Sequence, residues 1–165
     1  MPTEPTIRRR DAQPYVAIRR PVTMRTIPEI ADRLPEVFAW LAARGVEPAG
    51  PPFLRYRVID RERGMDIEAG VPVAEPVEGH NGVISGILPE GRYATVIHLG
   101  SFDKLIDVTA ALLDWGEREG LAWDMRETEY GQEWGCRLEL YKTNPKEEPD
   151  MGKWVTELAF RLADR

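Results

Sequence analysis

The sequence is poor in the residues that bind metals and form disulfides. It has one cysteine, Cys136, and two histidines, His80 and His98, among 165 residues. A single cysteine excludes an intramolecular disulfide and fits a reducing compartment, so we expect a cytoplasmic protein. These three residues lack the spacing of a metal site, and the chain has no phosphate-binding loop, dinucleotide fingerprint or serine elbow. We therefore expect neither a metal nor another cofactor.

Long apolar runs and excess basic charge are also missing. No stretch approaches the roughly 20 apolar residues of a membrane span, and no apolar run follows the charged N-terminus as in a secretory signal. The net charge is −6, from 22 basic and 28 acidic residues, which disfavours a phosphate backbone and mildly favours cations. The basic cluster Arg8 to Arg10 falls in residues 1–14, which we expect to form a flexible tail. We predict neither direct nucleic-acid binding nor membrane binding.

Two segments carry apolar residues at helical spacing and end at a glycine. The first runs from residue 27 to about 44, before Gly45, and the second from 103 to about 119, before Gly120. One strand candidate precedes each helix and two follow it. These strand candidates are residues 15–20, 51–60 and 65–73 in the first half, and 91–102, 136–142 and 153–162 in the second.

The same pattern therefore occurs twice along the chain. In each helix a tryptophan lies five residues before the terminal glycine, and Glu68 and Glu157 fall at matching places in the last strands. We predict one α+β domain over residues 15–162, formed by tandem duplication of a strand-helix-strand-strand unit, with half-repeats at about 15–88 and 89–162. Its antiparallel sheet carries two helices on one face, and a ligand cleft lies between pseudo-two-fold halves.

Strand alternation indicates which residues face away from the helices. If Leu138 and Leu140 pack under a helix, then Glu139 faces the opposite way, together with Glu68 and Glu157. A mid-strand glutamate usually just faces solvent. Carboxylates among aromatic rings, however, suit a large hydrophobic cation, because ring faces attract positive charge. The aromatic residues near these strands are Tyr56, Trp123, Tyr130, Trp134, Tyr141 and Trp154.

Several segments of the sequence, in the order in which they follow one another along the chain, resemble the GyrI-like small-molecule-binding family. This family includes effector-binding domains of MerR-type and AraC-type multidrug-sensing regulators. The resemblance covers about residues 15–162, and its most specific parts are LPEGRYA with H-x-G-S-F-D and the segment E-x-Y-x-x-x-P from Glu139 to Pro145. It implies the tandem fold with a cleft between the halves, where Glu139 meets cationic ligands. We take as further candidate cleft residues Phe53, Tyr56, Trp123, Trp134, Tyr141, Glu68 and Glu157.

The family's regulators carry a helix-turn-helix domain before this module, whereas only about 14 residues precede the first strand here, so the chain resembles a stand-alone member. The leading hypothesis is a protein that binds and sequesters bulky hydrophobic, preferentially cationic compounds. A second is a hydrolase that opens strained cyclopropane rings of natural products, with Glu139 as general base. A third is an inhibitor that binds a protein partner, as the family's gyrase inhibitor is thought to do.

Overall fold

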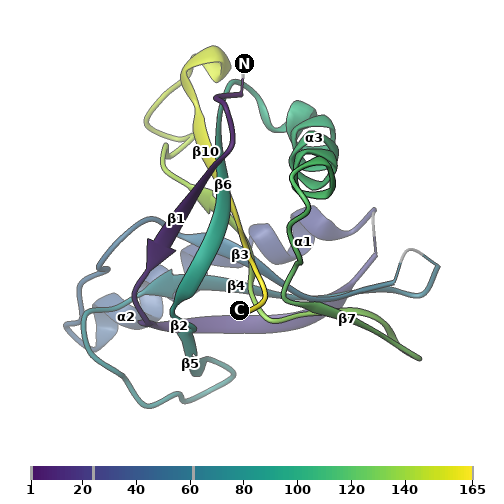
Figure 1. The fold of residues 1–165 in the computed structure, drawn as a ribbon. Coiled ribbons are helices and arrows are strands. Elements are labelled where there is room, and N and C mark those ends of the chain that lie inside the picture. The colour runs from purple at the N-terminus through teal and green to yellow at the C-terminus, as the bar shows by residue number, and fades with distance from the viewer. Residues whose placement is uncertain (1, 24, 61, 165) are drawn as a thin grey trace.

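The computed structural model describes residues 2–23, 25–60 and 62–164 (Figure 1). Within these ranges the chain forms one ten-stranded antiparallel sheet with helices. The elements are β1 (Thr6–Arg10), β2 (Gln13–Val22), α1 (Ile27–Ala31), α2 (Leu34–Ala43), β3 (Phe53–Asp60), β4 (Gly64–Pro72), β5 (Ile84–Leu88), β6 (Gly91–Leu99), η1 (Phe102–Lys104), α3 (Leu105–Arg118), β7 (Met125–Thr128), β8 (Gly131–Trp134), β9 (Arg137–Tyr141), η2 (Met151–Lys153) and β10 (Val155–Arg161).

The sheet has two halves that meet where β3 pairs with β9. The strand order is β1-β6-β10-β9-β3-β4-β2-β5, and Leu54 of β3 lies opposite Glu139 of β9. The central strands are β3 and β9, the strands outside them are β4 and β10, and the strands that precede the helices, β2 and β6, lie further out. The predicted α+β fold is therefore confirmed. This strand order agrees with a repeated strand-helix-strand-strand unit. That the two halves arose by tandem duplication stays a prediction.

Both helical regions cover the same face of the sheet (Figure 1). The single helix predicted from residue 27 to 44 is instead two helices, because Pro35 lies at the start of α2. Proline lacks a backbone N–H and its ring clashes with the preceding turn. Ile30 and Val37 pack on β2, β3 and β4, whereas α3 packs on β6 and β10. The two helical regions are thus held apart at opposite ends of one face.

The other face of the sheet curls onto itself and buries a second core. Tyr15 of β2 and Leu88 of the neighbouring β5 belong to one cluster with Tyr93 of β6, although β6 lies near the opposite end of the sheet order. Leu138 and Leu140 pack in this cluster, so the prediction that they lie under a helix was wrong. Neither face of this curled sheet is simply open, and both bury apolar side chains.

The N-terminal segment and one hairpin also depart from the prediction. Residues 1–14 were expected to form a flexible tail, but Thr6–Arg10 pair with β6 as an edge strand, and the backbone N–H of Thr3 donates to the Ile97 carbonyl at 2.8 Å. Pairing with β6 satisfies backbone groups that would otherwise be exposed at the sheet edge. The hairpin of β7 and β8, which pairs with β3, was not predicted.

Candidate functional site

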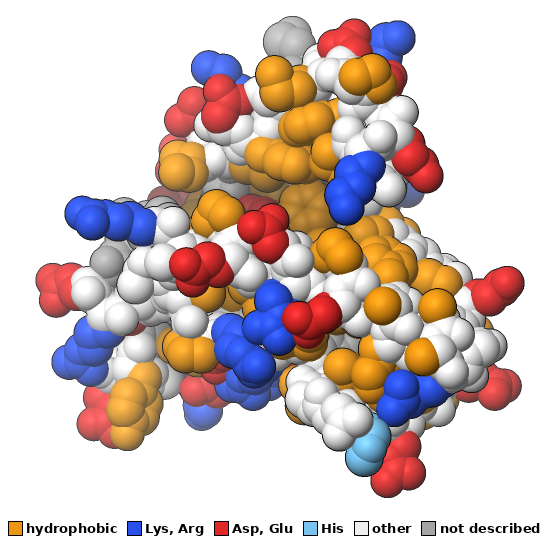
Figure 2. Space-filling view, turned by 180° about the vertical axis from the view of Figure 1, so that it is seen from behind, with side chains coloured by type: hydrophobic (Ala, Val, Ile, Leu, Met, Phe, Trp, Pro, Cys, Tyr) orange, Lys and Arg blue, Asp and Glu red, His pale blue; other side chains and the backbone are white. Residues whose placement is uncertain are grey.

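A groove of about 2370 Å³ runs along the helix-bearing face, between α1 and α2 on one side and α3 on the other. Figure 2 shows hydrophobic side chains around a hollow on this side of the molecule. Strands β3 and β9 form its floor, so the groove follows the junction of the two halves. The sequence predicted a cleft between the halves, but on the face away from the helices. The position of Glu139 explains the error, because it pairs with Leu54 and Leu158, which both lie under helices.

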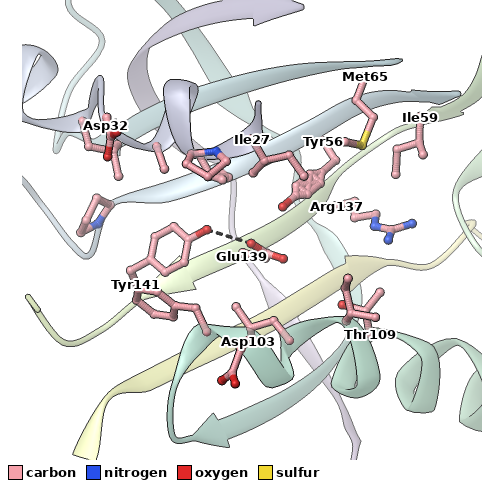
Figure 3. Close-up of a pocket in the computed structure, with 18 of the residues that line it drawn as sticks. Ile27, Asp32, Tyr56, Ile59, Met65, Asp103, Thr109, Arg137, Glu139 and Tyr141 are labelled. Carbon is pink, nitrogen blue, oxygen red and sulfur yellow. Dashed lines mark hydrogen bonds between the residues drawn. The ribbon is translucent and has the colours of Figure 1, made fainter. Parts of the chain in front are cut away.

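Glu139 lies at the centre of the groove floor (Figure 3). The Tyr141 hydroxyl donates to its Oε1 atom at 2.8 Å. Burial raises the pKa of Glu139, although hydrogen bonds from Tyr141 and Tyr56 and the charge of Arg137 oppose that rise. Burial and the nearby carboxylate raise the pKa of both tyrosines well above the usual value, so the hydroxyls stay protonated donors. The result is a carboxyl group oriented by two phenols and facing the groove.

Arg137 lies on the same strand face as Glu139 and also lines the groove (Figure 3). Its guanidinium carbon is 4.6 Å from the ring centre of Phe160, 4.8 Å from Trp134 and 5.8 Å from Tyr56. Contact with several aromatic rings holds the planar guanidinium in place. The sequence analysis missed this residue, although alternation alone puts it on the same face as Glu139.

Aromatic side chains come to the groove from both helical regions as well as from the floor. Phe38 of α2 and Phe102 of η1 line it together with Tyr56 and Tyr141. The rings of Phe102 and Tyr141 meet edge to face, with centres 5.5 Å apart, and Phe102 also lies 4.7 Å from Trp154. Neither phenylalanine was predicted as a site residue. Phe102 belongs to the H-x-G-S-F-D segment, which is one of the most specific parts of the family resemblance. That segment could therefore have indicated Phe102 as a site residue.

The groove is strongly acidic compared with the rest of the protein. Among the described residues that line it, ten carry a carboxylate and three carry a basic group. The whole chain has 28 acidic and 22 basic residues, which leaves 18 acidic and 19 basic outside the groove. The net negative charge is therefore concentrated at the groove. Its acidic residues are Asp32, Asp60, Glu62, Asp103, Asp114, Glu117, Glu127, Glu129, Glu139 and Glu147.

Three of the predicted aromatic site residues do not line this groove. Phe53 is fully buried on the opposite face, where its ring lies edge to face with Tyr15 at 5.3 Å. Trp123 and Trp134 pack under α3, with ring centres 6.0 Å apart. At Gly116 of α3, a Cβ atom would come within 2.3 Å of the Trp123 ring, so glycine permits this close packing. These three rings, predicted as cleft residues, form core contacts and do not line this groove.

The two other predicted glutamates face away from the groove. The Tyr15 hydroxyl donates to Glu68, which also lies 3.5 Å from an Nη atom of Arg57. Glu157 lies 3.3 Å from the Lys142 ammonium and 3.7 Å from Arg10. Both carboxylates are buried on the curled face of the sheet and hold ion pairs there. The matching positions of the two glutamates in the repeat favour such a structural role. Of the predicted site residues, the structure brings together Glu139, Tyr141 and Tyr56 in one groove.

The described part of the chain shows no group of three His, Cys, Asp or Glu side chains arranged to hold a metal ion. In the same ranges, no helix is both long and apolar enough to span a bilayer. The residues that line the groove offer aromatic surface, hydrogen-bond donors and carboxylates.

The fold and the groove define a class: an α+β domain with a curled sheet and a large, acidic groove between its helical regions. A model of the GyrI-like small molecule binding domain matches residues 3–163, so the chain belongs to this family. The family that the sequence resembles is thereby confirmed, and it is a family of small-molecule-binding domains. A comparison with curated protein sequences gives no match.

Solved structures share this fold at low sequence identity. The C-terminal domain of EcmrR has a TM-score of 0.72 at 19% identity, with 98% of each chain covered. EcmrR in its complex with DNA has a TM-score of 0.73 at 20% identity, but this chain spans only 58% of that one. SAV2435 bound to tetraphenylphosphonium has a TM-score of 0.66 at 11% identity, covering 98% and 94% of the chains. A hydrolase from Listeria innocua has a TM-score of 0.65 at 14% identity, covering 96% and 91%.

Proposed function

We propose that this protein binds bulky hydrophobic, preferentially cationic small molecules in the groove, with Glu139 as their counter-ion, and that it sequesters them. The observation that carries the proposal is the placement of Glu139 on the groove floor, between Tyr141 and Tyr56. A carboxylate there attracts positive charge without demanding a particular ligand shape. Ring faces around it add apolar area and cation–π attraction, worth about 0.5–2 kcal/mol for each contact.

Two further features support a cationic ligand. The groove has a net negative charge while the remainder of the chain is close to neutral, so a cation is drawn to this part of the surface. A protein of the same fold, SAV2435, has been solved with tetraphenylphosphonium, a cation surrounded by four phenyl rings. This compound is therefore a suitable first probe for the groove.

The test measures how removal of one charge affects two ligands of similar shape. Glu139→Gln should weaken tetraphenylphosphonium binding about tenfold or more, because a charge-assisted contact is lost. The same substitution should leave the affinity for triphenylphosphine oxide, a neutral aryl compound, within about twofold. Isothermal titration calorimetry measures both dissociation constants.

The matched control is Glu133→Gln on β8, which removes a sheet carboxylate that does not line the groove. It should leave both affinities unchanged. An equal loss for the cation and the neutral compound in Glu139→Gln would remove the counter-ion role. Failure of wild-type protein to bind either compound would count against the groove as a hydrophobic binding site.

The raised pKa of Glu139 favours a second candidate, hydrolysis of electrophilic cyclopropanoid natural products. A carboxylate that holds a proton more tightly is a better general base towards water. Glu139 would take a proton from water as its oxygen attacks a ring carbon. The strained carbon–carbon bond breaks, its electron pair moves to the conjugated carbonyl oxygen, and that oxygen takes up a proton.

Mass spectrometry tests this candidate directly. Wild-type protein should convert a spirocyclopropane dienone into a product heavier by one water, and Glu139→Gln should abolish the conversion. Tight binding of the dienone without any water adduct would reject the hydrolase and leave the binding proposal intact.

A further inference from the structure

A short turn joins β6 to η1 and brings Phe102 to the groove. The backbone N–H of Gly100 donates to the Trp154 carbonyl at 2.9 Å, which ties this turn to the residue before β10. The ring of Phe102 lies 4.7 Å from the Trp154 ring and meets the Tyr141 ring edge to face at 5.5 Å. Because the Tyr141 hydroxyl donates to Glu139, these rings continue the line of contacts that begins at the central carboxyl group (Figure 3).

His98, near the end of β6, holds the turn in place. It alternates along the strand with Ala94 and Val96, which pack under α3, so its ring faces the helix-bearing side of the sheet and is only 3% exposed. Its Nε2 atom lies 3.0 Å from the carbonyl oxygen of Ser101. A carbonyl can only accept a hydrogen bond, so Nε2 carries the proton and donates. The bonded carbonyl belongs to the peptide that links Ser101 to Phe102, so this bond fixes the point from which the Phe102 ring extends.

Within the described part of the chain, the bond to Ser101 is the one hydrogen bond of this imidazole. The Nδ1 atom of His98 is buried without a hydrogen-bond partner, and so is the hydroxyl of Thr156, which lies opposite His98 in the pairing of β6 with β10. Burying such a group is costly, so the ring is retained at a cost that an apolar side chain would avoid. At Gly100 (φ +140°), a Cβ atom would lie 3.3 Å from Nε2, so glycine lets the turn come this close.

Phe102 is the most exposed of the three rings and lines the groove. Its side chain is 37% exposed, whereas Tyr141 and Trp154 are half-buried. A ring that is held before a ligand arrives offers its surface at a lower entropic cost than one that must be ordered on binding. An aromatic group gains more from that surface than a saturated group of the same size, because paired rings attract beyond the area that they bury.

We propose that His98 is a positioning residue for the groove: by holding the peptide before Phe102, it fixes an aromatic surface that favours cations with aryl groups over cations with saturated groups of the same size. This inference rests on the proposed function, since it concerns the same groove. It goes beyond that function because it names the cations that are preferred and a residue, outside the groove lining, that sets the preference.

Methyltriphenylphosphonium and methyltricyclohexylphosphonium provide a matched pair of probes. They share the phosphonium charge and the number of carbon atoms, but only the first has aromatic rings. His98→Met loses the donor, and it should weaken the triphenyl compound about fivefold and the tricyclohexyl compound by less than about twofold. His98→Gln has an N–H donor on a side chain of the same length as methionine, so it should restore most of the wild-type affinity. Calorimetric titrations measure each dissociation constant.

Two further variants test whether His98 acts through the Phe102 ring. Phe102→Leu should cause the same selective loss, and adding His98→Met to it should cause no further loss. Gly100→Ala crowds the bonded nitrogen from the turn and should also weaken the triphenyl compound selectively, which keeps the inference testable if His98→Met does not fold. The matched control is the other histidine, His80, which is exposed and lies outside the groove. His80→Met and His80→Gln should leave both affinities unchanged.

The inference is overturned if His98→Met weakens both compounds equally, as a purely structural role would, or if it weakens neither. It is also overturned if His98→Gln behaves like His98→Met, or if His98→Met still weakens the triphenyl compound in the Phe102→Leu background. These outcomes leave the proposed function intact as long as wild-type protein binds both compounds and Glu139→Gln weakens them. If wild-type protein binds neither compound, the proposed function fails and this inference fails with it.

Discussion

The two faces of the sheet each bury a glutamate beside tyrosine hydroxyls and arginines, but the two carboxylates have different surroundings. Glu68 is only 1% exposed and accepts a hydrogen bond from Tyr15 while pairing with Arg57. The Tyr15 hydroxyl in turn accepts from Arg55 at 2.9 Å, which closes the network within the protein. Glu139 also has tyrosine donors, yet it opens onto a large groove lined by other elements.

This difference separates a carboxylate enclosed by its neighbours from one that faces a groove. The charge of Glu68 is satisfied by neighbours on its own sheet, and any ligand would have to displace them. Glu139 is oriented by two phenols but keeps an open side towards apolar walls. The same residue types therefore serve different purposes according to whether the surrounding network is closed. Substitutions on the two faces should separate stability from affinity.

The largest expected effect is the loss of stability in Glu68→Gln. Removing this buried charge leaves Arg57 without its anionic partner and weakens the acceptor of the Tyr15 hydroxyl, which should lower the free energy of unfolding by about 2–3 kcal/mol. Urea denaturation followed by tryptophan fluorescence measures it. Glu139→Gln should change stability much less, so similar losses in the two variants would contradict the comparison.

A smaller effect is expected from pH, and it should have opposite signs for stability and affinity. Burial raises the pKa of Glu139 above its ordinary value of 4.5, so the folded protein holds this proton to higher pH than the unfolded chain does. The contribution of Glu139 to the free energy of unfolding is therefore present below the unfolded pKa. It falls as pH rises through the interval up to the folded pKa. Affinity for tetraphenylphosphonium should rise over that interval, because the cation binds the carboxylate.

Titrations of wild-type protein and Glu139→Gln across the acidic range measure both changes. In Glu139→Gln, the parts of the stability and affinity profiles that depend on the titration of Glu139 should be absent. An affinity in wild-type protein that stays constant with pH would mean that the carboxylate does not meet the ligand's charge.

The smallest expected effect separates the two buried tyrosines. Tyr141→Phe removes the donor 2.8 Å from Glu139, so the pKa of Glu139 should rise further and tetraphenylphosphonium should bind a few-fold more weakly near neutral pH. Tyr15→Phe should instead lower stability by about 1 kcal/mol and leave that affinity unchanged. Calorimetric titration measures the affinity of both variants for tetraphenylphosphonium, and urea denaturation measures their stability. A loss of affinity in Tyr15→Phe but not in Tyr141→Phe would contradict the prediction.

Much of the fold could be predicted from the sequence, because helix periodicity and glycine stops repeat in the same order in both halves. The central glutamate was also predicted, from the segment around Glu139. Its face was predicted wrongly, since alternation sets Leu138 and Glu139 on opposite sides without indicating which side carries the helices. Apolar residues normally mark the helix side, but here the curled face buries Leu138 against its own core.

The errors among the aromatic residues have a related physical cause. A tryptophan near a strand can line a groove or pack in the core. Here the packing of α3 determines which of the two occurs. Trp123 reaches over Gly116 and becomes part of the core under that helix. The groove instead takes Phe38 and Phe102 from helical segments, and their distance from Glu139 in the sequence hid their proximity in space.

The concentration of negative charge at the groove also has a kinetic consequence. Because the rest of the chain is nearly neutral, a cation that approaches the protein is attracted mainly towards the groove. Association should then be fast at low ionic strength and slow down as salt screens the rim, whose carboxylates lie within about one 10 Å screening length of solvent. Dissociation depends on the floor, where Glu139 and the rings are shielded from ions. Salt should therefore change how often compounds enter this protein more than how long they stay.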